Sequence, residues 1–174
     1  MKMVNFPTTL KEIKDYAFQG CTGMNGELNI LDGVTTIGRY AFKGCTGING
    51  TLRFPSTLTS INYSTSDTLG IEKLVIQDNM ENISERSFSG NNNLTEITIP
   101  ISLNATGGST SFYGCTNITK INFTKGTGTG HDYSNSTNGS YYQNTPWYIS
   151  RGHEIEVKFE EGITTIGTYM FYRM

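Results

Sequence analysis

Three cysteines and two histidines are the residues of this chain best suited to bind a metal or to act as nucleophile or base. Cys21 and Cys45 are 24 residues apart, and Cys115 follows 70 residues after Cys45. A metal site needs clustered ligands, as in C-x₂-C pairs, and no histidine recurs with these cysteines. The spacing therefore predicts structural thiols, with no metal site and no bound cofactor.

His131 and His153 are each followed by an acidic residue. Such a pair could be a catalytic base with the group that orients it. Neither pair has a nucleophile at a recognisable spacing, so we expect both histidines on the surface. The stretch KGTGTGHD (125–132) matches neither G-x-x-x-x-G-K-[ST] nor G-x-G-x-x-G and is predicted to be a flexible loop. No catalytic residue is predicted, and the chain is not expected to be an enzyme.

The composition fits a folded, turn-rich domain. Of 174 residues, 36% are apolar, 16% are charged and 20 are glycine, which describes neither a disordered chain nor a membrane protein. The net charge is −2 and the Lys and Arg residues are scattered, so no nucleic-acid partner is expected. No apolar run reaches the roughly 20 residues of a membrane span, and no signal peptide is recognisable.

One stretch of thirteen residues occurs twice in nearly identical form, as YAFQGCTGMNGEL (16–28) and YAFKGCTGINGTL (40–52). The rest of the chain aligns on the same pattern at a period of 22 to 24 residues, which is typical of a solenoid. The aligned columns are Leu10, Val34, Leu58, Met80 and Leu103; Ile13, Ile37, Ile61 and Ile83; Phe18, Phe42, Phe88, Phe112 and Phe171; Cys21, Cys45, Asn91 and Cys115; and the pairs Leu28/Ile30, Leu52/Phe54, Leu74/Ile76, Ile97/Ile99, Ile121/Phe123 and Val157/Phe159.

These columns predict stacked coils. Each alternating pair sends two side chains inward and its neighbours outward, as a short strand does. Successive coils pair these strands in parallel, and the segments between them, with Leu, Ile and Phe at offsets of three and five, suit irregular or 3₁₀-like return arms. The third coil, INYSTSDTLGI, lacks both the Ala-Phe pair and the cysteine.

Stacking places Cys21 directly above Cys45, at the bend where the arm turns back toward the strand. The distance between coils would permit a disulfide, but stacked side chains point the same way rather than at each other. We therefore expect buried thiols here. Asn91 holds the same position in another coil and is expected to bond backbone groups that the bend leaves open.

The columns resemble the bacterial BspA-like leucine-rich repeats over nearly the whole chain. The resemblance implies a right-handed leucine-rich-repeat solenoid of about six to seven coils, mainly β, with one parallel sheet. It also implies a secreted or cell-surface bacterial protein that binds a protein or glycan partner in adhesion. The residues that carry it are Leu10-Ile13-Ala17-Phe18-Cys21, Val34-Ile37-Ala41-Phe42-Cys45, Met80-Ile83-Phe88 and Phe112-Cys115.

The chain opens inside one repeat, at VNFPTTLKEI, and stops inside another, at ITTIGTYMFYRM. We interpret residues 1–174 as a single solenoid domain belonging to a longer protein. Residues 124–150 depart from the pattern and are predicted to form an irregular insertion within it.

The outward side chains of the predicted sheet are the first candidate binding surface, because a solenoid presents them as one extended face. They carry both signs of charge, which argues against a simple polyanion as partner. The alternative is an ordinary solvated face. The candidate partner-binding residues on this face are Glu27, Asn29, Arg53, Lys73, Lys120, Asn122, Glu156 and Lys158.

The second candidate surface is the Tyr-, Ser-, Asn- and Gly-rich segment 127–149, a composition used by adaptable recognition surfaces. Its candidate residues are Tyr133, Tyr141, Tyr142 and Trp147. In the alternative reading, Trp147 and Tyr148 replace the Phe column in a longer coil.

Two other function classes compete with a binding module. A structural spacer would display another domain at the cell surface, and its sheet face would bind nothing. A retaining glycosidase would need two carboxyl groups about 5 Å apart, whereas Glu27, Glu96 and Glu156 fall on separate coils.

Overall fold

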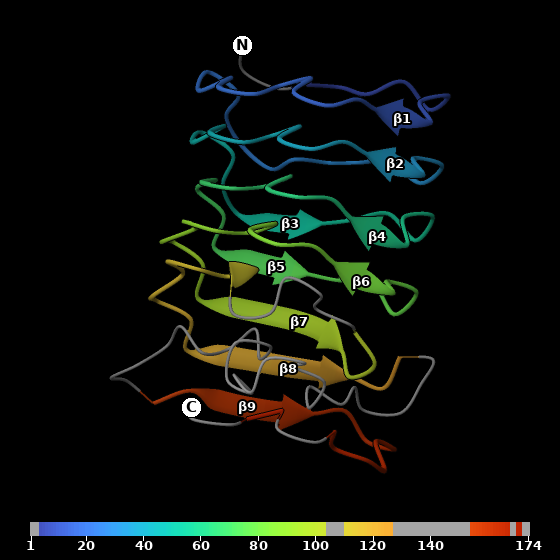
Figure 1. Cartoon of the computed structure of the whole chain (residues 1–174), viewed down its shortest axis with the longest axis vertical. Helices are drawn as coiled ribbons and strands as arrows, with labels where there is room; N and C mark the ends of the chain where they lie inside the picture. The colour runs from blue at the N-terminus through green and yellow to red at the C-terminus, as the bar shows by residue number, and fades with distance from the viewer. Residues whose placement is uncertain (1–3, 104–109, 127–153, 168–169, 172–174) are drawn as a thin grey trace, which may run out of the picture.

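Figure 1 shows the computed structural model, in which the chain winds into stacked coils. Residues 4–103, 110–126, 154–167 and 170–171 are described. The main sheet is parallel and has five strands in the order β3, β5, β7, β8 and β9, and no α-helix occurs among the described residues. The strands are β3 (Thr51–Arg53), β5 (Lys73–Val75), β7 (Glu96–Pro100), β8 (Lys120–Thr124) and β9 (Glu156–Phe159).

Four shorter strands lie in the return arms. They pair as two separate parallel ladders, β1 with β2 and β4 with β6, and Figure 1 shows their arrows running opposite to those of the main sheet. The prediction of a single sheet was thus incomplete. Each return arm contributes a buried isoleucine to a short ladder, and these ladders form a second wall of the solenoid opposite the main sheet. These strands are β1 (Glu12–Ile13), β2 (Thr36–Ile37), β4 (Ser60–Ile61) and β6 (Asn82–Ile83).

Between the two walls, the arm advances by consecutive tight turns. In the first coil, the N–H groups of Tyr16, Phe18 and Gly20 donate to carbonyl groups of the next coil at 2.8–2.9 Å. The N–H groups between them close turns within their own coil. This alternation satisfies the backbone N–H groups of the arm without a helix, and it joins each coil to its neighbour by hydrogen bonds.

The five strands of the main sheet mark about four turns of the solenoid. An isolated bridge between Asn29 and Arg53 adds one rung before β3. The predicted fold is confirmed, but six to seven coils is slightly too many for the part of the chain described. Lys120 of β8 pairs with Glu156 of β9, which comes 36 residues later in the chain (120 to 156), and residues 127–153 between them lie outside the described residues.

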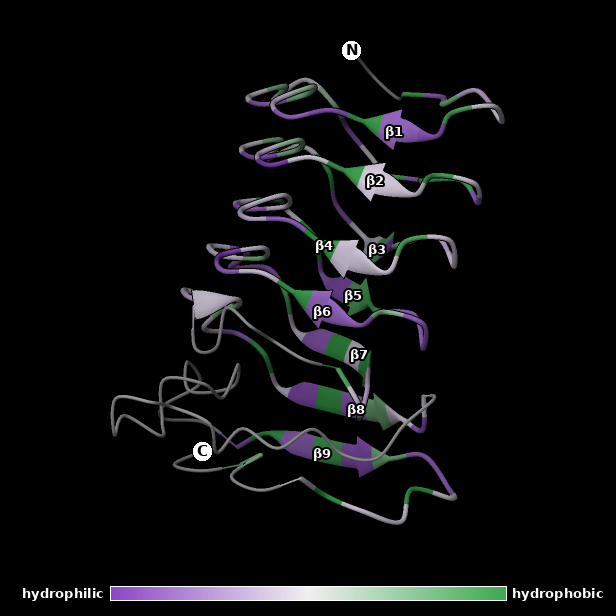
Figure 2. Ribbon diagram, turned by 45° about the vertical axis from the view of Figure 1, so that its right-hand side comes forward, coloured by the Kyte–Doolittle hydropathy of each residue, from purple (hydrophilic) through white to green (hydrophobic). Residues whose placement is uncertain are grey.

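The predicted columns form the core between the two walls. We number the coils one to five by the residue at the Phe position, which is Phe18, Phe42, Ser66, Phe88 and Phe112. The rings of coils one and two stack at 5.4 Å between centroids, as do those of coils four and five. Ser66 interrupts this stack in coil three. Figure 2 shows the matching alternation of polar and apolar residues along β7 and β8.

Coil three also departs at the tight turn. The position held by Gly20, Gly44 and Gly90 in other coils has φ of +70° to +73° and is taken by Thr68, with φ +59°. A β-branched residue is strained in this left-handed region, where glycine is not.

The Asn91 side chain bonds the backbone of coil three at Ser66 and Leu69. Its Oδ1 accepts the N–H of Leu69 at 2.8 Å, and its Nδ2 donates to the carbonyl of Ser66 at 2.9 Å and to that of Phe88 at 2.6 Å. In coils one, two and five the equivalent N–H and carbonyl bond directly, at 3.0–3.1 Å. The Asn91 amide thus completes a turn of the preceding coil, which confirms the prediction that it bonds open backbone groups.

Candidate functional site

The outward side chains of the main sheet form two rows that we call the sheet face. The strand register places Thr51, Lys73, Glu96, Lys120 and Glu156 in one row. The second row holds Arg53, Val75, Thr98, Asn122 and Lys158, and the Asn29 bridge extends it by one rung. The predicted candidates in these rows therefore share one face, spread along its length from the Asn29 rung to β9, and Glu27 lies at its N-terminal end.

Over β5, β7 and β8 the charges on this face pair with one another. The Glu96 carboxylate lies 3.0 Å from the ammonium groups of both Lys73 and Lys120, and it accepts a hydrogen bond from Asn122 at 2.8 Å. We call these four residues the charge ladder. Hydrogen bonds from Lys120 and Lys73 lower the pKa of Glu96 to about 2. On β9, Lys158 pairs with Glu156 at 3.0 Å.

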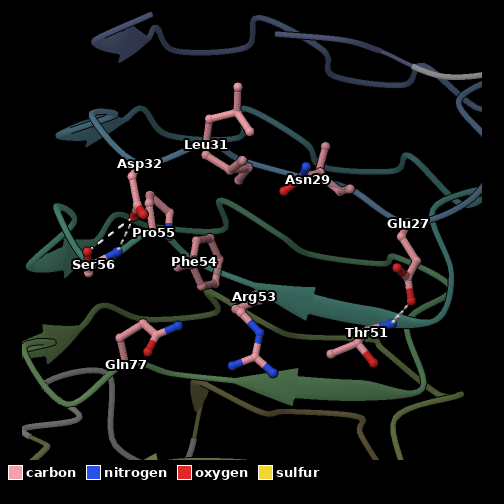
Figure 3. A pocket seen from close by; sticks show the side chains of 12 residues that line it. Glu27, Asn29, Leu31, Asp32, Thr51, Arg53, Phe54, Pro55, Ser56 and Gln77 are labelled. Atoms are coloured by element: carbon pink, nitrogen blue, oxygen red, sulfur yellow. Dashed lines mark hydrogen bonds between the residues drawn. The ribbon is translucent and has the colours of Figure 1, made fainter. Parts of the chain in front are cut away.

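At the N-terminal end the sheet face is hollowed into a groove of about 820 Å³ (Figure 3). The first rung, which contains Glu27 and Asn29, joins β3 irregularly. The N–H of Thr51 donates to the Glu27 carboxylate at 3.5 Å and not to a backbone carbonyl. The matching N–H groups of later rungs bond backbone carbonyls at 2.8–3.3 Å. The lining residues are 27–32, Thr51, 53–56 and Gln77.

Arg53 is the cation of this groove. Its side chain is exposed and forms no ion pair with any described residue, unlike Lys73 and Lys120 in the charge ladder. Asp32 is partly engaged, since its Oδ1 accepts both the N–H and the Oγ–H of Ser56 at 3.1 Å. In Figure 3 the guanidinium lies between the side chains of Gln77 and Thr51. The groove therefore holds one guanidinium that forms no ion pair with a described residue, together with the carboxylates of Glu27 and Asp32.

The aromatic candidates Tyr133, Tyr141, Tyr142 and Trp147 lie outside the described residues, as do His131 and His153. The second candidate surface therefore stays a prediction.

Sequence reasoning missed the loop residues of the groove and an aromatic cluster on the return arms. Asp32, Ser56 and Gln77 lie one or two residues after the alternating pairs, and this position was the available signal. Elsewhere, the rings of Tyr16 and Tyr40 stack at 5.1 Å, and Tyr63 packs edge-on against Tyr40 at 5.5 Å. The signal for this stack was the tyrosine that opens both copies of the duplicated motif. The three rings join coils one to three, and the outermost, Tyr16, is 54% exposed.

The three cysteines are free thiols; Cys45 and Cys115 are buried, as predicted, whereas Cys21 is only partly buried. The thiols of Cys45 and Cys115 donate to the carbonyls of Phe18 and Phe88 at 2.9 and 3.1 Å. Burial raises the pKa of Cys45 to about 11 and that of Cys115 to about 12. Such thiols stay protonated at neutral pH and are poor nucleophiles and ligands.

Glu27, Glu96 and Glu156 lie on separate rungs, and Lys120 stands between the last two in the row. Within the described residues, no three His, Cys, Asp or Glu side chains cluster as metal ligands would. In the same residues, no helix has the length and apolar character needed to span a bilayer.

Comparison with known proteins agrees with this geometry. The model of the BspA type leucine rich repeat region matches residues 1–26 and 11–139, in six copies. The chain belongs to this family. BspA-type repeats form solenoids that are generally non-catalytic, and the family suggests a binding role at a surface. No curated protein matches the sequence.

Two crystal structures are similar to this BspA-type solenoid. A leucine rich cell surface protein from Faecalibacterium prausnitzii A2-165 matches with a TM-score of 0.65 and 20% identity, over 84% of this chain and 35% of that one. A leucine-rich repeat protein from Bacteroides ovatus ATCC 8483 matches with a TM-score of 0.46 and 19% identity, over 99% of this chain and 58% of that one. The first likeness supports the fold, and the chain spans only part of either protein.

Proposed function

We propose that the chain is an extracellular binding module, secreted or held at the bacterial cell surface, whose sheet face recognises a protein or glycan in adhesion. The observation that carries this proposal is the groove of about 820 Å³ with the unpaired Arg53 in it. A groove of this size is within the range of ligand sites, and an unpaired exposed cation gains by meeting an anionic partner. The family and its cell-surface relative agree with this role.

The binding test centres on Arg53→Glu. The purified fragment is screened against immobilised extracellular matrix proteins and a glycan array, and its hits are measured again with the variant. Reversing Arg53, the one cation among the described residues that line the groove, should weaken a sheet-face hit by tenfold or more, since one hydrogen bond to a charged group is worth about 1.5–3 kcal/mol. Arg39→Glu makes the same charge change on a return arm and should leave binding unchanged.

Lys73 and Lys120 are less suitable for this test. Their substitution by glutamate would place further negative charge beside Glu96 and break the charge ladder. Lost binding would then report a disturbed sheet. A hit that survives Arg53→Glu but is lost when Tyr133, Tyr141, Tyr142 and Trp147 become alanine would assign recognition to the aromatic segment.

The charge ladder favours a second candidate, a structural spacer. A face whose charges satisfy one another gains little from a partner. A spacer would show no hit in the screen, and the Arg53→Glu variant would keep the function of the full-length protein.

A further inference from the structure

We propose that the groove binds a sugar residue that bears a single carboxylate, with Arg53 as the partner of that carboxylate. The proposal rests on the sheet face being a binding surface and names the chemical class of its ligand. Arg53 supports it first, because a guanidinium presents a planar set of donors that matches a carboxylate with two parallel hydrogen bonds. No described residue occupies those donors.

The acids of the groove set the charge that the ligand can carry. Glu27 uses Oε1 on the Thr51 N–H, and Asp32 uses Oδ1 on Ser56. With two carboxylates and one guanidinium, the groove repels a polyanion such as a sulfated chain. It favours a ligand with one negative charge, placed at Arg53 and away from these acids.

The same acids favour hydroxyl groups on the rest of the ligand. Glu27 Oε2 and Asp32 Oδ2 accept no hydrogen bond from a described residue, and each can accept one from a ligand hydroxyl. The side-chain amides of Asn29 and Gln77 also line the groove, and an amide can donate to one hydroxyl and accept from its neighbour. A ring with several hydroxyl groups and one carboxylate fits this set.

The groove suits a sugar better than an acidic peptide. A peptide gains most of its affinity from apolar anchors in pockets or from the edge of a sheet. Here the lining exposes more polar than apolar surface, and its aromatic side chain, Phe54, is only 1% exposed. The groove residues Thr51 and Arg53 lie on β3, which pairs with β5 on one side and is bridged to Asn29 on the other, so β3 offers a peptide strand no free edge.

The experiment compares ligands that differ only in the carboxylate. Isothermal titration uses 3′-sialyllactose against its C1 carboxamide, and a glucuronic-acid-terminated disaccharide against its glucose counterpart. In parallel, ¹H–¹⁵N spectra follow the Arg53 Nε–H signal, assigned through Arg53→Gln. We expect at least one carboxylated sugar to bind about tenfold or more tightly than its neutral counterpart and to shift the Arg53 signal. The preference should vanish in Arg53→Gln and persist in Arg39→Gln.

Each outcome decides the proposal. The two sugar pairs show which source of the carboxylate is recognised. Equal binding of a neutral counterpart, or a preference that persists in Arg53→Gln, would overturn the assignment of Arg53. If neither carboxylated sugar binds while an acidic peptide or an immobilised protein binds and loses affinity in Arg53→Gln, the sugar proposal fails and the proposed function stands. If nothing binds in any assay, both fail.

Discussion

At the residue scale, coil three shows how one irregular repeat is accommodated. Thr68 adopts φ +59° where other coils have glycine, and the hydroxyl groups of Ser64 and Ser66 are buried without a partner among the described residues. These are local costs, because strained φ values and unmade hydrogen bonds both destabilise a fold. The Asn91 amide offsets part of them.

Replacing Thr68 with glycine should stabilise the protein. The change relieves the left-handed strain, while the added freedom of glycine in the unfolded chain offsets part of the gain, which leaves about 0.5–1 kcal/mol. Urea unfolding of the variant measures the difference in free energy. The reverse change at the equivalent position, Gly44→Thr, should destabilise by a similar amount, about 0.5–1 kcal/mol, because the same two effects act with opposite sign. Its added Cβ would have space, with the nearest atom at 3.8 Å. A destabilised Thr68→Gly variant would mean that the threonine side chain does more than strain the turn.

The role of Asn91 was only partly predictable from the sequence. Its place in the cysteine column indicated that it bonds open backbone groups, and the structure confirms this. That two of those groups, Leu69 N–H and Ser66 C=O, belong to the preceding coil could not be read from the column. The thiols of Cys45 and Cys115, in the same column, also donate to a carbonyl of the preceding coil, so this reach belongs to the stacking of the coils.

At the element scale, the main sheet joins its strands by side chains as well as by backbone. The charge ladder runs across β5, β7 and β8, and Glu96 is its centre. The two rows and their charges were predictable, because alternation and a fixed period determine which residues face outward. The groove was not, since it arises where Thr51 N–H bonds a side chain in place of the regular ladder.

Acid should weaken the sheet through Glu96. Its pKa is lowered to about 2 in the folded protein, against about 4.3 for an unperturbed glutamate. Its stabilising contribution is therefore present above about pH 4.3 and is lost as the pH falls toward 2. Urea unfolding between pH 2 and 6 should show a shallower pH dependence for Glu96→Gln than for the parent.

The matched control is Glu156→Gln, whose ion pair is with Lys158 of its own strand. This variant should keep more of the parent's pH dependence. Identical profiles for the parent and Glu96→Gln would show that the ladder does not contribute to folding.

At the scale of the whole molecule, the solenoid is a chain of nearest-neighbour contacts. Its fold was predictable because several apolar columns recur together at one period. The paired isoleucine strands of the return arms were not predicted, because two residues are too few to show a period-two pattern. The coil count was slightly too high for the described residues, because a sequence column does not show whether a terminal rung forms regular pairs.

A core cavity in one coil should therefore affect the next. Phe42 is fully buried and stacks on Phe18, so Phe42→Ala should cost about 3–5 kcal/mol. Native-state hydrogen exchange should show faster exchange at Phe18 N–H, which donates to the carbonyl of Ala41 in the affected coil. Phe159→Ala, at a ring that is 40% exposed, should cost less. Damage confined to coil two would contradict nearest-neighbour coupling.

The Asn91 amide also bears on how such a chain can change during evolution. Most coils differ from their neighbours only in side chains, so a whole repeat could be gained or lost by unequal recombination and still leave every column aligned. Coils three and four are an exception. A gene that lost coil three alone would leave Asn91 without Leu69 and Ser66, and one that lost coil four would leave their N–H and carbonyl open. We expect these two repeats to be inherited, duplicated or deleted together, as one cassette of two coils.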